Sequence, residues 1–281
     1  MKNSLVFIAA FGALFFSCIE NPFGGDDNIS GGTRSLHGQI NLSNGASAEG
    51  AYVWLEGFNL GARANSNGKF TVTLPPAASQ GSSGATGVFQ LYFFLANYTL
   101  KTAAIVTRNG TFVYDQGELD RNGELRNAKV LERFLRISTQ VIPATVAASY
   151  AGTINVETTL EATIDTATVV FPNTLAGLLS AVLVRRAGSN EVLGIYEAVP
   201  NAEGVETQRI GRTAVKRSMS FNFLTRPLPP GDYEVVPYFL IRHQQLPALL
   251  MASLGGNAEQ LGPGYLNLPM QREGGQLGAI G

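Results

Sequence analysis

The side chains that could carry out catalysis are few and far apart in this chain. It has two histidines, His37 and His243, near opposite ends of the sequence, and a single cysteine, Cys18. A zinc site needs histidines and cysteines at short, fixed spacings such as H-E-x-x-H, and neither histidine has such a neighbour. We therefore predict no metal site and no cofactor, and we interpret both histidines as structural residues of strands.

Other catalytic patterns are equally weak. The stretch QGSSGATG lacks the G-x-S-x-G spacing of a nucleophile elbow, and the adjacent carboxylates Asp26 and Asp27 fall in a segment predicted to be flexible. The sequence has no phosphate-binding loop and no dinucleotide-binding glycine pattern after a strand. We predict that the chain has no catalytic residues and is not an enzyme. A hydrolase with a site between two domains is the alternative.

The beginning of the chain has the layout of a secretory signal. Lys2 is followed by an apolar run from Leu5 to Phe16 and then by the small residue Ser17. A hydrophobic segment of ~7–15 residues between a positive start and a small residue at the cleavage site is typical of such signals. Glu20 ends the run before the ~18 apolar residues that a membrane-spanning helix needs. We therefore predict a signal and not an anchor helix.

The residues LFFSC, which end at Cys18, resemble the lipobox of bacterial lipoproteins. In that family the signal is cleaved before the cysteine, here between Ser17 and Cys18, and the cysteine becomes the lipid-modified first residue. Phe15 departs from the branched aliphatic residue usual at its position. The resemblance implies a lipid anchor in the bacterial envelope, and Ile19 favours the outer membrane. An ordinary signal beside an incidental cysteine is the alternative, but Cys18 has no second cysteine as a disulfide partner.

Composition limits the remaining possibilities. Of the 281 residues, 45% are hydrophobic and 15% are charged, which is typical of a folded chain. The 20 Lys and Arg residues oppose 21 Asp and Glu residues, whereas a nucleic-acid-binding protein normally has a basic excess. We predict a signal peptide at 1–17, a flexible tether at 18–34, two folded domains after it, and no nucleic-acid partner.

The first folded segment has the pattern of β-strands. Ala51, Val53 and Leu55 alternate with other side chains, as in a half-buried strand, and NSNG at 65–68 predicts a hairpin turn. The run VFQLYFFLANYTL is apolar at successive positions, which predicts a central strand buried on both faces. Short strands of this kind favour a β-sandwich.

Three segments of this region resemble the carboxypeptidase regulatory-like, or transthyretin-like, domain. They are Gly38–Ile40, Gly50–Leu55 and Asn67–Val72, the last of which leads into Leu74-Pro75-Pro76. The resemblance implies a β-sandwich, which we place at 35–145. It also implies a domain that accompanies an activity and does not perform one.

Tyr52 and Trp54 are the candidate binding residues. If Ala51, Val53 and Leu55 face the core, the period of two turns Tyr52 and Trp54 to the other face of the sheet. Aromatic side chains on an outer face can stack on sugars or anchor a protein partner. The alternative is that they pack under a loop or against the second domain.

The region between the domains offers two ambiguous segments. Asp120 to Glu124 supplies only part of the ligand pattern of a calcium loop, so we favour an Asn-Gly turn. The stretch from Ala128 to Ile137 fits the periods of both helix and strand, and we favour strand.

Runs rich in Thr, Val and Ile after Pro143 predict a second, Ig-like β-sandwich at 146–270. The stretch QQLPALLMASLGG is the best helix candidate, because Pro247 suits a first helical turn and the glycines suit its end. The Gly-rich residues 271–281 predict a disordered tail.

These patterns together predict an all-β protein of two β-sandwich domains, transthyretin-like then Ig-like, with little helix. They favour a non-catalytic binding or structural module that is lipid-anchored in the cell envelope, with an envelope protein or polysaccharide as its partner. An alternative function is that of an envelope glycan-binding protein that uses Tyr52 and Trp54.

Overall fold

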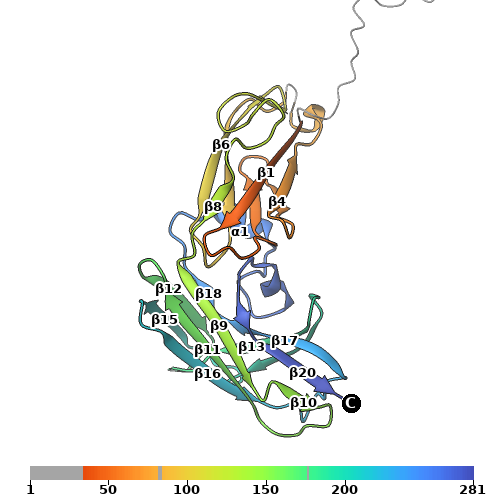
Figure 1. Ribbon diagram of the computed structural model, residues 1–281, viewed down its shortest axis with the longest axis vertical. Coiled ribbons are helices and arrows are strands. Elements are labelled where there is room, and N and C mark those ends of the chain that lie inside the picture. The colour runs from red at the N-terminus through yellow and green to blue at the C-terminus, as the bar shows by residue number, and fades with distance from the viewer. Residues whose placement is uncertain (1–33, 82–83, 176) are drawn as a thin grey trace, which may run out of the picture.

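The chain forms two β-sandwiches joined end to end (Figure 1). The computed structural model describes residues 34–81, 84–175 and 177–281. Ser17, Cys18, the predicted signal peptide and all but the last residue of the predicted tether lie outside the described residues. The all-β fold with little helix is confirmed.

The first sandwich consists of two sheets, of strand order β3-β2-β5-β6-β7 and β4-β1-β8. Its strands are β1 (Ser35–Leu42), β2 (Tyr52–Leu55), β3 (Leu60–Arg63), β4 (Lys69–Thr73), β5 (Gly87–Phe94), β6 (Lys101–Arg108), β7 (Thr111–Phe112) and β8 (Lys129–Leu131), with a short 3₁₀ turn, η2 (Ala77–Ser79).

The second sandwich has three sheets, of strand order β10-β20-β17-β13-β14, β16-β11-β9-β19 and β15-β12-β18. Its strands are β9 (Leu135–Ile142), β10 (Thr145–Ala147), β11 (Ile154–Ala162), β12 (Ala167–Pro172), β13 (Ala181–Arg186), β14 (Val192–Glu197), β15 (Val205–Ile210), β16 (Val215–Phe221), β17 (Gly231–Tyr238), β18 (Leu240–Ile241), β19 (Glu273–Gly274) and β20 (Gln276–Ile280).

Period-two alternation explains why these segments form half-buried strands. In β11 every second residue is buried, from Ile154 to Ala162, and the intervening Asn, Glu and Thr side chains are less buried. The predicted central strand is β5, which lies between β2 and β6. The predicted burial on both faces is found only at the end of β5, where Phe93 and Phe94 are buried. Val88 at the start of the strand is 65% exposed.

A helical segment interrupts the second sandwich between β18 and β19. Helix α1 (Ala248–Ser253) begins directly after Pro247 and buries Leu250, and the 3₁₀ helix η3 (Pro263–Asn267) follows it. The predicted helix is therefore confirmed. No helix of the described residues is long and apolar enough to cross a membrane.

Both ambiguous segments agree with the favoured predictions. The carboxylate oxygen Oδ1 of Asp120 accepts hydrogen bonds at 2.8 Å from the backbone N–H groups of Asn122 and Glu124. These bonds stabilise a turn. Residues 128–137 form β8 and the start of β9, separated by a short connection. NSNG is a turn but not the predicted hairpin, because it carries the chain from β3 in one sheet to β4 in the other.

Two predicted boundaries need correction. The first domain does not extend to residue 145, because β9 pairs along its whole length with β11 of the second sandwich. Residues 271–281 are not a disordered tail. They contain β20, which lies between β17 and β10, and its Leu277 is 1% exposed. The prediction of disorder from glycine content was wrong, because these glycines occur within an alternating strand.

Candidate functional site

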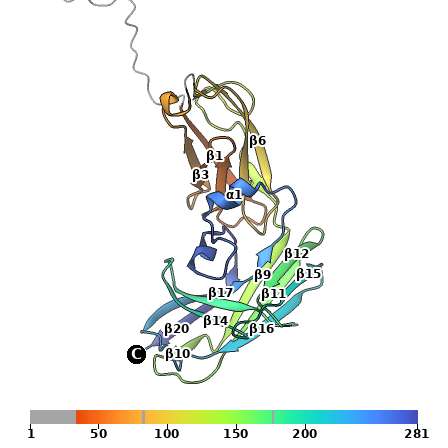
Figure 2. The same ribbon diagram turned by 180° about the vertical axis from the view of Figure 1, so that it is seen from behind.

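The segment between β18 and β19 leaves the second sandwich and covers the outer face of β2 in the first (Figure 2). The side-chain hydroxyls of Tyr52 and Ser253 in α1 lie 2.9 Å apart. The guanidinium of Arg63 donates to the backbone carbonyl of Asn267 at 2.6 Å. The contact joins parts of the chain about two hundred residues apart in sequence.

This contact changes the interpretation of the candidate binding residues. Tyr52 and Trp54 do lie on the face of β2 opposite Val53, but they are only 7% and 1% exposed. The indole N–H of Trp54 donates to Oδ1 of Asn59 at 3.0 Å, which satisfies its one polar atom. The prediction that these aromatic side chains are accessible was wrong, because the C-terminal segment covers them. The alternative prediction, that they pack against the second domain, describes their position.

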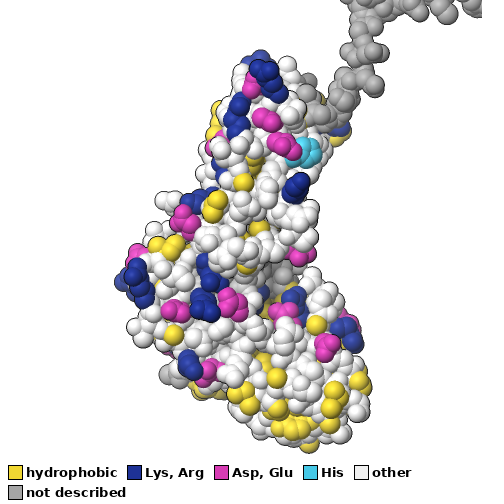
Figure 3. Space-filling model, viewed as in Figure 1, with side chains coloured by type: hydrophobic (Ala, Val, Ile, Leu, Met, Phe, Trp, Pro, Cys, Tyr) yellow, Lys and Arg dark blue, Asp and Glu magenta, His cyan; other side chains and the backbone are white. Residues whose placement is uncertain are grey.

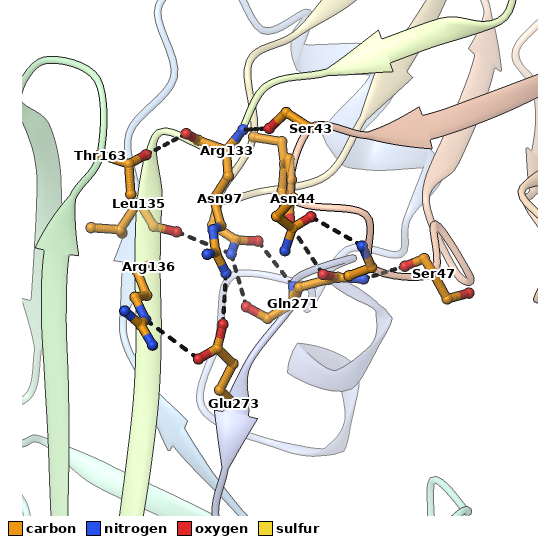
Figure 4. A network of polar contacts seen from close by, with 12 residues as sticks. Ser43, Asn44, Ser47, Asn97, Arg133, Leu135, Arg136, Thr163, Gln271 and Glu273 are labelled. Carbon is orange, nitrogen blue, oxygen red and sulfur yellow. Dashed lines mark hydrogen bonds and ion pairs between the residues drawn. The ribbon is translucent and has the colours of Figure 1, made fainter.

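A polar network connects the two sandwiches beside this contact (Figure 4). Asn97 is 1% exposed, and its side chain makes three hydrogen bonds. Its amide group donates to the carbonyls of Leu135 and Gln271 at 3.2 and 2.8 Å, and its Oδ1 accepts from the N–H of Gln271 at 2.9 Å. A buried amide with all these partners fixes both backbones, because each group would be costly to leave unpaired.

Charged side chains extend the same network toward solvent (Figure 4). Glu273 of β19 pairs with Arg133 at 2.6 Å and with Arg136 at 3.4 Å. The N–H of Arg133 also donates to Oγ of Ser43 in the first sandwich at 3.0 Å. The short connection between β8 and β9 is therefore held from both domains.

The two histidines lie in different places, so the structure does not bring them together. His37 is on β1, with Nδ1 2.9 Å from Oγ1 of Thr71. His243 follows β18 at the junction, where its Nε2 donates to the carbonyl of Ala96 at 2.6 Å. Burial lowers the pKa of His243 and favours the neutral ring, which packs edge-on against Phe94 and Phe134. His37 thus lies within a strand and His243 just beyond the end of one, as predicted.

A cleft of about 740 Å³ opens beside His243, between the two sandwiches. In Figure 1 the loop that follows β18 lies at the junction of the two sandwiches, between β6 and β12. The lining residues are Gln90, Tyr92, Thr99, Leu100, Thr102, Phe134, Thr166, Ala167, Thr168, Arg242, His243, Gln244 and Gln245. Sequence reasoning missed this cleft and the Asn97 network, because both depend on residues brought together only by the docking of the domains.

Other surface features indicate no particular ligand. Hydrophobic side chains gather at the far end of the second sandwich, near the end of the chain (Figure 3). Two strand ends carry exposed apolar side chains, Ile142 at the end of β9 and Ile280 at the end of β20, at 51% and 59% exposure. Within residues 34–81, 84–175 and 177–281, no group of three His, Cys, Asp or Glu side chains is placed to hold a metal ion.

Comparisons with known proteins identify no family. No family model matches the chain, and no curated protein matches it in sequence. Among solved structures, it is similar to AggA, the major subunit of aggregative adherence fimbriae type I from Escherichia coli, with 15% identity, coverage of 36% of this chain and 77% of that one, and a TM-score of 0.24.

Two pilin structures are similarly distant. The major pilin subunit BcpA of Bacillus cereus has 10% identity, coverage of 74% of this chain and 68% of that one, and a TM-score of 0.26. A streptococcal ancillary pilin has 11% identity, coverage of 76% and 60%, and a TM-score of 0.24. Similarities this low carry no conclusion about activity. The class that the structure itself defines is an all-β protein of two docked sandwiches.

Proposed function

We propose that the chain is a non-catalytic envelope lipoprotein, anchored by lipid on Cys18, that presents two rigidly docked sandwiches to an envelope partner. The observation that carries this proposal is the junction. Aromatic side chains of β2 are buried under α1, and Asn97 of the first sandwich bonds to Leu135 and Gln271 of the second. A stiff body of this kind holds its far surface at a defined distance from an anchor.

The direction of the chain supports the same arrangement. Strand β1 starts at Ser35, at the end of the first sandwich that is remote from the second (Figure 1). A lipid on Cys18 would hold that end near the bilayer, with the Gly- and Asp-rich residues between them as a tether. The second sandwich would then point away from the membrane. We further propose the outer membrane, from Ile19 after the cysteine.

Metabolic labelling with a palmitate analogue, followed by membrane fractionation, tests the anchor. The wild-type chain is expected to carry the label and to sediment with the outer membrane, and Cys18→Ala is expected to lose both. Ser17→Ala keeps a small residue before the cysteine and is the matched control, which should label like wild type. A wild-type chain that is unlabelled and soluble would contradict the proposal.

A further inference from the structure

The cleft between the sandwiches has walls from both domains. Gln90 and Tyr92 of β5 and Thr102 of β6 lie on the first. Thr166, directly before β12, and Thr168 within it lie on the second. Because the junction fixes these walls relative to each other, the cleft exists before any ligand arrives. Its volume of about 740 Å³ falls within the ~300–1,000 Å³ of small-molecule sites.

The lining is polar but almost uncharged. Besides Tyr92, seven of its side chains are neutral amides or hydroxyls: Gln90, Thr99, Thr102, Thr166, Thr168, Gln244 and Gln245. Each amide has both a donor and an acceptor end, and each hydroxyl can act as either, which matches the hydroxyl groups of a sugar. Arg242 is the one Lys, Arg, Asp or Glu side chain in the lining, and burial lowers the pKa of His243 and favours its neutral form.

An aromatic ring lies among these polar groups. Tyr92 is half-buried, and its ring packs at 5.7 Å from that of Trp54, tilted by 46°. Trp54 is itself covered, so it supports Tyr92 from within the molecule. The apolar C–H face of a sugar ring can pack on such an aromatic side chain while its hydroxyls bond to neighbouring amides.

The loop beside the cleft has an unusual backbone. Gln245 has a φ of 67°, in the left-handed region that residues other than glycine rarely adopt. Its side chain and that of Gln244 are exposed and line the cleft. Backbone strain that the surrounding structure maintains is concentrated at ligand-binding sites, and this strained residue lies in the loop that lines the cleft.

We propose that this cleft binds an uncharged oligosaccharide, through Tyr92 and the amides of Gln90, Gln244 and Gln245. The site extends the proposed envelope function to a class of ligand. It does not depend on the lipid anchor, so binding can be measured in solution on the full chain with Cys18→Ala. Loss of anchoring and loss of sugar binding are therefore separate results.

The test is calorimetric titration with cellotetraose, maltotetraose and chitotetraose, with a trimer of galacturonic acid and a neutral tetrapeptide as comparison ligands. At least one neutral sugar is expected to bind at millimolar concentration or tighter. Gln245→Ala, Gln244→Ala and Tyr92→Ala should each weaken it by about threefold to tenfold. Gln140→Ala, an exposed amide on β9 away from the cleft, should leave the affinity unchanged.

Several results would overturn the proposal. These are no binding of any neutral sugar by the wild-type chain, binding that the cleft variants do not alter, and preferred binding of the acidic trimer or the peptide. Because Tyr92 packs on Trp54, its variant is checked by circular dichroism. If Tyr92→Ala does not fold, the exposed positions Gln244 and Gln245 decide the question.

Discussion

The two sandwiches close their hydrophobic cores in different ways. The core of the first is built entirely from residues 36–131, with Leu36, Val53 and Phe93 among its fully buried members. The apolar cluster of the second continues across the junction and includes Tyr52, Trp54 and Phe94 of the first. The core of the first sandwich thus lies within that sandwich, whereas the core of the second continues into its neighbour.

Strand β2 belongs to both cores at once. Val53 and Leu55 pack inside the first sandwich, and Tyr52 and Trp54 on the opposite face pack under the C-terminal segment. Because one short strand serves both cores, substitutions on its two faces can separate the stability of the first sandwich from that of the junction.

The largest effect is expected from Trp54→Ala. The change removes a fully buried indole and its hydrogen bond to Asn59, so we expect the free energy of unfolding to fall by about 3–5 kcal/mol. Hydrogen exchange should show loss of protection in α1 as well as in β2. Leu55→Ala on the other face is the matched variant, and its loss of protection should be confined to the first sandwich. Unchanged protection of α1 in Trp54→Ala would contradict the shared core.

Leu277→Ala tests whether the last strand is part of the second core. Leu277 is 1% exposed between β17 and β10, and we expect denaturant unfolding to report a loss of about 2–4 kcal/mol. Ile280→Ala changes the same strand at a side chain that is 59% exposed, so its effect should stay below about 1 kcal/mol. Equal effects of the two variants would mean that the strand is not packed as described.

Asn97→Ala examines the polar part of the junction. The variant leaves the carbonyls of Leu135 and Gln271 and one N–H group without their partner, at an expected cost of about 1–3 kcal/mol. Small-angle scattering should then report a wider range of interdomain distances. Asn41→Ala, at an exposed amide of β1, should change neither quantity. Scattering identical to wild type would show that the apolar contact alone holds the domains together.

The smallest effect concerns acid stability, and it compares one ion pair in each sandwich. Hydrogen bonds from Arg217 lower the pKa of Glu206 below its ordinary value of 4.5, and Arg126 similarly lowers the pKa of Asp115. A carboxylate with a depressed folded-state pKa contributes stability above its unfolded pKa, and the contribution is lost as the pH falls through the folded value.

Glu206→Gln should therefore lower stability at neutral pH and flatten its decline below about pH 4.5. Asp115→Asn should have a weaker effect, because that pair is exposed, whereas the Arg217 side chain is 4% exposed. Thermal unfolding across the acid range measures both. A stronger acid response from Asp115 than from Glu206 would contradict this ranking.

Much of the local structure was predictable because it depends on local patterns. Alternation identified β2, and Thr, Val and Ile content identified the segment of β11. The Asn-Gly signals identified turns at Gly68 and Gly123, both with φ above +70°. Pro247 marked the start of α1. The prediction went wrong for the last residues, where glycine content suggested disorder but pairing with β17 makes a strand.

Strand and turn preferences depend on near neighbours, so the fold class, the turns, the helix and the residues of β2 that share a face follow from the amino-acid sequence alone. What covers that face follows from the docking of the domains. Asn97 and Gln271 are 174 residues apart, and the cleft walls come from different domains. No local pattern specifies such pairs, because their contact follows from how two separately formed sandwiches dock.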